Sequence, residues 1–264
     1  MVLPPVALNG PIITIRQFPT HPIEMEQLIA WGAVTKDAVE FLQKLVIAGY
    51  NIFISGGTGS GKTTFLNALS NYIPKQERII TIEDNAELQI RGVENLVRLE
   101  ARKGNTQGDH EITIRDLIRA SLRMRPDRVI VGEVRGEETI DMIQAMNNGH
   151  DGSLSTGHGN SPRDMLARLE TMVLMGMELP VSAVRRQIAS GLDIMVHLGR
   201  MRDRSRKVLE ILEITGYSYE KEEILTHTLY EFEETGKGQE KVIGTLIKKG
   251  ELQQTRKLER AGLL

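Results

Sequence analysis

One eight-residue segment limits the possible folds of this chain more than any other part of its sequence. Residues 56–63 read Gly-Gly-Thr-Gly-Ser-Gly-Lys-Thr and fit the pattern G-x-x-x-x-G-K-[ST]. An apolar segment precedes them at residues 51–55, and a segment with helical periodicity follows at residues 63–72. A glycine-rich loop between a strand and a helix offers backbone N–H groups and the positive end of a helix dipole to an anion. The segment therefore predicts a loop that binds the phosphates of a nucleoside triphosphate.

The side chains of this loop have separate expected roles. The glycines let the backbone adopt positive-φ conformations and direct its N–H groups inward. Lys62 is expected to reach the β- and γ-phosphates, and Thr63 to place its hydroxyl on Mg²⁺. With ATP and Mg²⁺ as the expected cofactors, the predicted nucleotide-binding residues of this segment are Gly57, Thr58, Gly59, Ser60, Gly61, Lys62, Thr63 and Thr64.

Strand and helix patterns alternate through the middle of the chain. We expect strands at residues 51–55, 78–82 and 128–132 and helices at residues 36–48, 63–72, 114–123 and 137–147. Short apolar strands separated by helices are typical of a parallel sheet that is buried on both faces. The predicted fold class is therefore α/β, with a parallel-rich central sheet.

The two ends of the chain show weaker patterns. A short strand is expected at residues 11–18, followed by a linker that ends in a short helix before residue 32. A β-hairpin is expected at residues 207–217 and 223–233, and a charged helical stretch over residues 241–264. The strand at residues 11–18 has no hairpin partner nearby, which leaves its edges unpaired.

Acidic residues follow two of the predicted strands. Glu133 comes directly after the strand at residues 128–132, where an open α/β sheet places its ligands, so we expect it near the Mg²⁺. Glu83 and Glu87 follow the strand at residues 78–82, and one carboxylate of that set is expected to orient or deprotonate the attacking water. The alternative roles are structural: Glu133 as a helix cap or surface acid, and the second set as caps of a turn that pair with Arg91.

Two histidines lie in an expected loop that is rich in glycine and hydroxyl residues. His150 and His158 are separated by Asp-Gly-Ser-Leu-Ser-Thr-Gly. Two such residues after a strand-helix unit suggest sensing of the γ-phosphate, although a lone histidine is more often structural. A basic cluster at residues 200–207 has two readings as well, contact with anionic lipid or a hydrated loop before a strand.

Composition excludes several classes of function. The 264 residues include no cysteine, so disulfides, thiol nucleophiles and cysteine-bound zinc are excluded. The net charge of -2 and the aromatic content of 4% give no support to a nucleic-acid binder, which needs basic surface and stacking side chains. No stretch approaches the roughly 20 apolar residues of a membrane span.

Four ordered segments together resemble the traffic ATPases of type II and type IV secretion. They are residues 56–63, 81–84, 123–136 and 149–158, which in that family are the Walker A motif, the Asp box, the Walker B motif and the His box. They look closest to the branch that assembles tight-adherence (Flp) pili. The absence of a tetracysteine module argues against the branch for type II secretion and type IV pilus extension.

The resemblance implies a RecA-like P-loop NTPase domain in a homohexameric ring. Such a ring would lie at the cytoplasmic face of the inner membrane and contact membrane proteins of a secretion or pilus assembly platform, with no nucleic acid expected. By position, Glu87 matches the catalytic glutamate of the Asp box, Glu133 that of Walker B, and His150 and His158 the His-box histidines. Catalytic roles are therefore expected for these four residues and, as the alternative carboxylate, for Glu83.

The resemblance also implies a domain organisation. Residues 1–33 would be a remnant of an N-terminal domain plus a linker, and residues 34–264 the RecA-like ATPase domain with its hairpin and helical tail. We expect such a fragment to assemble and hydrolyse ATP poorly without upstream sequence. Arg16, near this junction, is the expected charge-stabilising arginine at the nucleotide.

Two other functions remain open at this point. One is a nucleotide-dependent switch that binds a partner and barely hydrolyses, although the guanine-reading N-K-x-D motif is absent. The other is a RecA-type motor that moves DNA. Multiple-turnover phosphate release distinguishes the first from a motor, and stimulation by DNA identifies the second.

Overall fold

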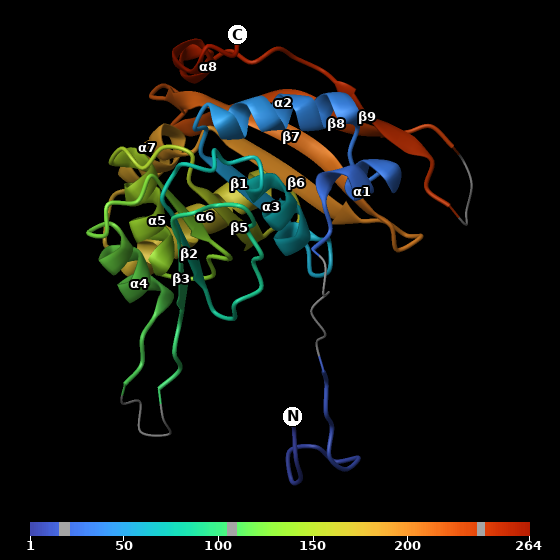
Figure 1. Cartoon of the computed structure of the whole chain (residues 1–264), viewed down its shortest axis with the longest axis vertical. Coiled ribbons are helices and arrows are strands. Elements are labelled where there is room, and N and C mark those ends of the chain that lie inside the picture. Colours follow the sequence, from blue (N-terminus) through green and yellow to red (C-terminus); the bar gives the residue numbers. More distant parts are fainter. Residues whose placement is uncertain (16–21, 105–109, 237–240) are drawn as a thin grey trace.

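The protein is described by a computed structural model that covers residues 1–15, 22–104, 110–236 and 241–264 (Figure 1). Within these residues, nine strands form one sheet in the order β3-β2-β4-β5-β1-β6-β7-β8-β9. The strands are β1 (Ile52–Gly56), β2 (Ile79–Glu83), β3 (Leu96–Glu100), β4 (Arg128–Val131), β5 (Leu154–His158), β6 (Ile194–Arg200), β7 (Arg206–Ser218), β8 (Glu223–Glu234) and β9 (Gly244–Lys248). The helices are α1 (Met25–Ala30), α2 (Lys36–Ile47), α3 (Lys62–Ser70), α4 (Ile114–Ser121), α5 (Glu138–Asn147), α6 (Pro162–Gly176), α7 (Val181–Gly191) and α8 (Arg256–Ala261).

The sheet has a parallel half and an antiparallel half. Strands β1 to β6 run parallel to their neighbours, whereas β6 to β9 form an antiparallel meander. The predicted α/β fold with a parallel-rich sheet is therefore confirmed, and β7 and β8 form the predicted late hairpin. Among the described residues, none of the helices combines the length and the apolarity that crossing a membrane requires.

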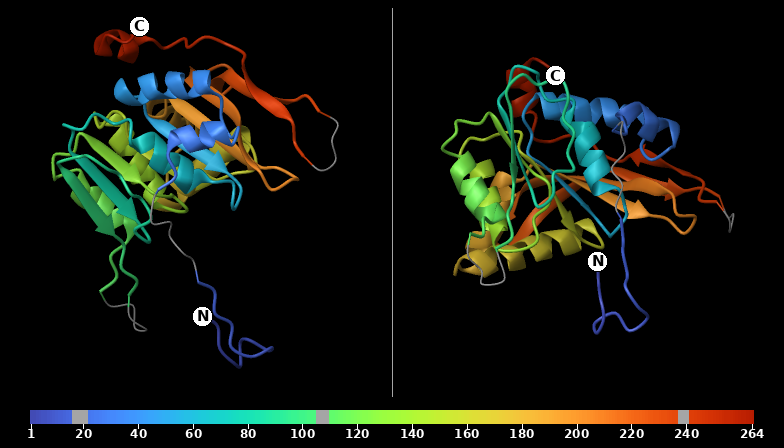
Figure 2. Two further views of the ribbon diagram at one scale, coloured as in Figure 1. Left: turned by 45° about the vertical axis from the view of Figure 1, so that its right-hand side comes forward. Right: turned by 60° about the horizontal axis from the view of Figure 1, so that its bottom comes forward.

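Two helical layers cover the faces of the sheet, as the rotated views show (Figure 2). Helices α1, α2, α3 and α8 contribute to one apolar cluster, and α4, α5, α6 and α7 pack against the other face. Strand β1 belongs to both layers, because Ile52 and Ile54 lie in the first cluster and Phe53 in the second. All three side chains are fully buried, which is why the strand reads as a continuous apolar run.

The structure corrects the expectation for the C-terminal stretch. Only α8 is helical, whereas Gly244–Lys248 pairs with β8 as strand β9. Leu246 is buried in the sheet's apolar cluster, and a side chain at Gly244 would collide with the backbone of Glu233. The charged residues around this strand resemble a helical pattern in the sequence. Tertiary packing nevertheless decides the conformation here.

The N-terminal strand expected at residues 11–18 is not formed in the part that the structure describes. Residues 11–15 carry only an isolated antiparallel bridge between Val2 and Ile12, and residues 16–18 lie outside the described ranges. The helix α1 that follows buries Met25 and Leu28 in the first apolar cluster, to which α2, α3 and α8 also contribute. The division of the chain at residue 33 stays a prediction.

Strand β5 lies in the centre of the sheet, where the sequence suggested a loop. It pairs with β1 on one side and β4 on the other. Gly157 makes this position possible, because a Cβ there would lie 2.8 Å from Phe53 Cζ and 3.0 Å from Met165 Cε. A glycine between these two side chains therefore lets β5 and α6 pack closely.

Substituting Gly157 by alanine should test this packing. We expect Gly157→Ala to lower the free energy of unfolding by about 1–3 kcal/mol, because the added methyl group forces Phe53 or Met165 to move. Chemical denaturation of the two proteins measures the difference. Gly57→Ala is the matched control, since a Cβ at that glycine meets no atom within 4 Å and should leave unfolding unchanged.

Candidate nucleotide-binding site

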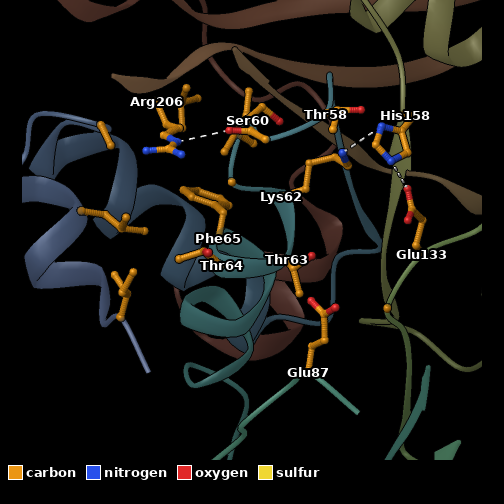
Figure 3. Close-up of a pocket in the computed structure, with 18 of the residues that line it drawn as sticks. Thr58, Ser60, Lys62, Thr63, Thr64, Phe65, Glu87, Glu133, His158 and Arg206 are labelled. Atoms are coloured by element: carbon orange, nitrogen blue, oxygen red, sulfur yellow. Dashed lines mark hydrogen bonds and ion pairs between the residues drawn. The ribbon is translucent and has the colours of Figure 1, made fainter. Parts of the chain in front are cut away.

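A cavity of about 810 Å³ lies at the carboxyl ends of the parallel strands (Figure 3). Strand β1 leads into the glycine-rich loop, β2 and β5 end at Glu83 and His158, and the segment after β4 adds Glu133. Because parallel strands finish at the same edge of a sheet, segments that are far apart in the sequence meet here. Ligands of open α/β sheets bind at this edge.

The glycine-rich loop has the backbone geometry that its sequence predicts. Gly59 and Gly61 have φ angles of 73° and 95°, in the left-handed region that favours glycine. Gly61 is also the N-cap of α3, so the helix begins directly beneath the loop. A Cβ at Gly56 would collide with the Leu198 carbonyl group. The cavity is lined by seven of the eight loop residues predicted to bind nucleotide, Thr58, Gly59, Ser60, Gly61, Lys62, Thr63 and Thr64.

The remaining predicted loop residue, Gly57, meets the Lys62 side chain. The Lys62 ammonium group donates to the carbonyl oxygens of Gly56 at 3.1 Å and Gly57 at 3.2 Å. Lys62 is 7% exposed. Burial lowers the pKa of its ammonium group, and the negative charge of Glu133 opposes this shift. A cation held in this way, among backbone dipoles at a helix N-terminus, suits a polyanionic ligand.

His158 connects Lys62 to Glu133. Its Nδ1 lies 3.3 Å from the Lys62 Nζ, and its Nε2 lies 2.8 Å from Glu133 Oε1 (Figure 3). An ammonium group can only donate, so Nδ1 accepts and the ring proton sits on Nε2. Burial, with Lys62 as a further cause, lowers the pKa of His158 below its usual value. The imidazole is therefore a neutral bridge between a cation and a carboxylate.

Glu133 is held from a second side by Arg135. The guanidinium Nε and Nη2 of Arg135 donate to Glu133 Oε2 at 2.9 and 2.5 Å, and its Nη1 lies 3.4 Å from Asp84. Arg135 thus spans the carboxyl ends of β2 and β4. The hydrogen bonds to Glu133 raise the pKa of Arg135, so it stays charged. No local pattern in the sequence predicts this role for Arg135, although it lies two residues after Glu133.

The two carboxylates of the Asp box differ in their surroundings. Glu83 is 4% exposed, and its Oε1 accepts backbone N–H groups from Glu87 at 2.9 Å and Leu88 at 2.8 Å. Burial raises the pKa of Glu83 even though these hydrogen bonds oppose the shift. Glu87 is more exposed and points toward the Thr63 side of the cavity (Figure 3). Glu83 therefore shapes the loop that carries Glu87.

The two His-box histidines do not meet. His150 precedes strand β5, whereas His158 is its last residue, so the length of the strand separates them. The carbonyl oxygen of His150 accepts from Ser153 Oγ, and Ser153 N donates to Asn51 at the amino end of β1. His150 therefore lies at the edge of the sheet opposite the cavity, and its expected sensing of the γ-phosphate stays a prediction. Arg16 lies outside the described residues.

The far end of the cavity is apolar and was not anticipated from the sequence. It is formed by residues of the segment around α1, by α3 and by the β6–β7 region, namely Ile23, Leu28, Trp31, Ala33, Phe65, Leu198 and Val208. Lys207 Nζ donates to the Gly32 carbonyl at 2.7 Å, which fastens this segment to β7. Arg206 lies beside the loop near this end (Figure 3). No local motif marks these residues, because the contacts join distant parts of the chain.

The oxygen donors at the other end fit the predicted Mg²⁺. Thr63, Glu87 and Glu133 line the same side of the cavity as the loop lysine. Magnesium bound with nucleotides needs one or two protein oxygens, and phosphates and waters complete its coordination. Among the described residues no group of three or more acidic or histidine side chains is arranged to hold a metal by itself. The donor set is thus one for a metal that arrives with phosphates.

Comparison with known proteins identifies the family of this chain. The family described as "Type II/IV secretion system protein" matches residues 2–250. A putative conjugal transfer protein of Mycobacterium tuberculosis is 40% identical over 210 residues, which cover 80% of this chain and 59% of that protein. The type IV secretion system protein PtlH of Bordetella pertussis is 40% identical over 177 residues, 65% of this chain and 52% of PtlH. The chain thus spans between half and six tenths of these relatives.

Solved structures agree with this assignment. The VirB11 ATPase from the Brucella suis type IV secretion system, in complex with sulphate, matches with a TM-score of 0.61 and 33% identity, over 73% of this chain and 56% of that one. The Legionella pneumophila ATPase DotB matches with a TM-score of 0.57 over 78% of this chain and 54% of that one, and at 22% identity it supports the fold alone. The family match covers nearly the whole described sequence, including all the segments that meet at the cavity, and this chain belongs to the type II/IV secretion system protein family.

Proposed function

We propose that this chain is the ATP-hydrolysing part of a motor that powers type IV secretion or the assembly of Flp-type pili. The observation that carries the proposal is the convergence of Lys62, Glu133 and His158, from three separate segments, on one cavity beside the glycine-rich loop. The family match and the likeness to the VirB11 ATPase, at 33% identity, support the same activity. The Flp branch within the family stays a prediction.

The proposed reaction depends on positioning and charge, because phosphoryl transfer needs little covalent help from a protein. Lys62 and the N-terminus of α3 would bind the β- and γ-phosphates, and the loop N–H groups would orient them. When bound, Mg²⁺ would neutralise charge on those phosphates. Thr63 would hold the metal directly, with Glu133 supporting it at the end of β4.

Glu87 is the residue that we propose orients the attacking water. Its side chain lines the cavity on the Thr63 side, whereas Glu83 is buried with its Oε1 bound to two backbone N–H groups. A carboxylate that faces the cavity can accept a proton from water, while a buried one that holds a turn cannot leave it without disturbing the loop. Glu83 is therefore a positioning residue in this proposal.

His158 is proposed to sense the terminal phosphate. The neutral ring lies between Lys62 and Glu133, so a phosphate that attracts Lys62 would change both contacts of the imidazole. Strand β5 carries this change into the centre of the sheet, since it pairs with β1 and β4. No such path is proposed for His150.

The assembled protein is proposed to be a homohexamer at the cytoplasmic face of the inner membrane, bound to secretion or pilus platform proteins and not to nucleic acid. The grounds are the family match and the absence, among described helices, of one able to span a membrane. Sustained phosphate release without DNA supports the motor. A single turnover per active site would favour the binding switch, and stimulation by DNA the DNA-moving alternative.

Removing the loop lysine tests the site. We expect Lys62→Ala to reduce phosphate release at least about a hundredfold, because the charge that meets the transferring phosphate is lost. The circular dichroism spectrum should not change. Lys36→Ala is the control, since this lysine lies on the surface of α2 with its side chain 80% exposed. Retained turnover in Lys62→Ala would remove the basis of the assignment.

The two glutamates of the Asp box should separate in kinetics. We expect Glu87→Gln to slow single-turnover hydrolysis by about 10²–10⁴ while ATP affinity changes little, because water activation acts on the transition state. Glu83→Gln should slow it much less, since an amide oxygen can still accept the two backbone N–H groups. If Glu83→Gln proves the more damaging change, Glu83 is the catalytic carboxylate.

The protonation of His158 gives a pH-dependent signal. Its pKa is lowered from 6.5 by burial and by Lys62, so the neutral ring should persist below pH 6.5. Its contribution to stability is present above that pH and is lost as pH falls through the folded-state pKa. Histidine resonances followed by NMR, with His158→Asn for assignment, should show a midpoint below 6.5. A midpoint above 6.5 contradicts the neutral bridge.

A further inference from the structure

The basic cluster at residues 200–207 contains one arginine that reaches the nucleotide cavity. Arg206 is the first residue of β7, and its Nε donates to the Gly59 carbonyl oxygen at 3.2 Å. Its Cγ would be 3.8 Å from a Cβ placed on Gly61, so the side chain runs along the outside of the glycine-rich loop. Figure 3 shows it on the opposite side of that loop from His158. Neither of the two readings of the basic cluster, a hydrated loop or a contact with lipid, explains why the Arg206 side chain lies against the glycine-rich loop.

The turn before Arg206 is firmly held. Met201 N donates to Ser205 O at 2.8 Å, and Arg204 N donates to Met201 O at 2.9 Å. Asp203 accepts from the backbone and hydroxyl of Ser205 and from Val242 N. On the other side, Lys207 and Val208 bind the carbonyl oxygens of residues 32 and 33. The backbone at Arg206 is thus fixed from both directions, which restricts where its guanidinium group can lie.

The charge of Arg206 has no carboxylate partner among the described residues, whereas two other basic side chains of the cluster are held by bonds within the chain. Arg202 pairs with Glu234, and Lys207 is bound to the Gly32 carbonyl. The bond from Nε to Gly59 uses one of the five guanidinium N–H groups. The remaining donors and the whole positive charge lie at the wall of a cavity that already fits a polyphosphate.

The position of Arg206 along the cavity indicates which part of a nucleotide it would meet. Lys62, Thr63 and Glu133 mark the end for the terminal phosphates, and Trp31 and Val208 belong to the apolar end. Arg206 lies between the two, next to Gly59 and Gly61. A nucleotide that spans the cavity would therefore place its inner phosphates and ribose beside Arg206.

We propose that Arg206 binds the inner phosphate oxygens of a nucleoside di- or triphosphate held by the same subunit. The proposal rests on the proposed binding of ATP at the glycine-rich loop. Its chemistry is a charge-assisted hydrogen bond from a guanidinium group to a phosphate, a pairing that suits the forked geometry of arginine. Because the contact is made to the inner phosphates and not to the γ-phosphate, it forms with ATP and with ADP. It also couples the binding of nucleotide to the turn between β6 and β7.

Calorimetric titration with ADP and with a non-hydrolysable ATP analogue tests this contact. Arg206→Gln should weaken both ligands about tenfold, since a charge-assisted bond is lost. It should also make the affinity less sensitive to salt between about 0.05 M and about 0.5 M. Arg206→Lys keeps the charge and should restore most of the affinity. Arg202→Gln removes the same charge from the same turn outside the cavity and should change affinity less than about twofold.

Three results would overturn the proposal. The first is an unchanged affinity for both ligands in Arg206→Gln, and the second is a loss of affinity for the triphosphate analogue alone. The third is a loss of affinity whose salt dependence is unaltered, which would mean that Arg206 only supports the loop through Gly59. Lys62→Ala separates this failure from that of the proposed function. If ADP binds the unmodified chain and Lys62→Ala abolishes it while Arg206→Gln does not weaken it, only the arginine contact is wrong. If the unmodified chain does not bind ADP, both proposals fail.

Discussion

The burial of the Lys62 charge is the interaction on which the site depends. Its ammonium group lies among the carbonyl oxygens of Gly56 and Gly57 and a neutral imidazole, with no carboxylate among the described residues in direct ion pair with it. Carbonyl dipoles and a neutral ring stabilise the cation without cancelling it, so the cavity keeps a positive potential at the start of α3. Glu133 approaches this charge only through His158. A polyanion can therefore compete for Lys62 more easily than it could against a direct salt bridge.

The parallel sheet brings the groups around that charge together. Strands β1, β2, β4 and β5 end at one edge, and each carries one chemical element of the site to it. Close packing makes this convergence possible, since Gly157 lies against Phe53 and Met165 where a larger residue would push β5 away. The antiparallel half is connected to the same cavity from the other side, through Arg206 on the glycine-rich loop and Lys207 on the segment after α1. Movement of either half of the sheet would thus change the walls of the cavity.

The sequence predicted best what local pattern determines. The glycine-rich loop lies between its strand and helix as expected, because glycine conformations and apolar periodicity are local properties. Prediction from local pattern failed for β5, because its Leu-Ser-Thr-Gly-His sequence is buried by packing and not by its own apolarity. For the same reason the sequence did not show that this strand separates His150 from His158. Strand β9 was hidden by surrounding charge. Arg206 could not be placed, because its contact with Gly59 spans 147 residues of sequence and depends on the tertiary fold.

The most direct measurement is a crystal structure of the chain with Mg²⁺ and a non-hydrolysable ATP analogue. The terminal phosphate should lie within about 3 Å of Lys62 Nζ, with Lys62 withdrawn from the Gly56 and Gly57 carbonyl oxygens and its contact with His158 altered. The metal should lie on the Thr63 hydroxyl, and the base should lie toward Trp31. A nucleotide bound elsewhere, or one bound while Lys62 remains on the two carbonyl groups, would contradict this mode of binding.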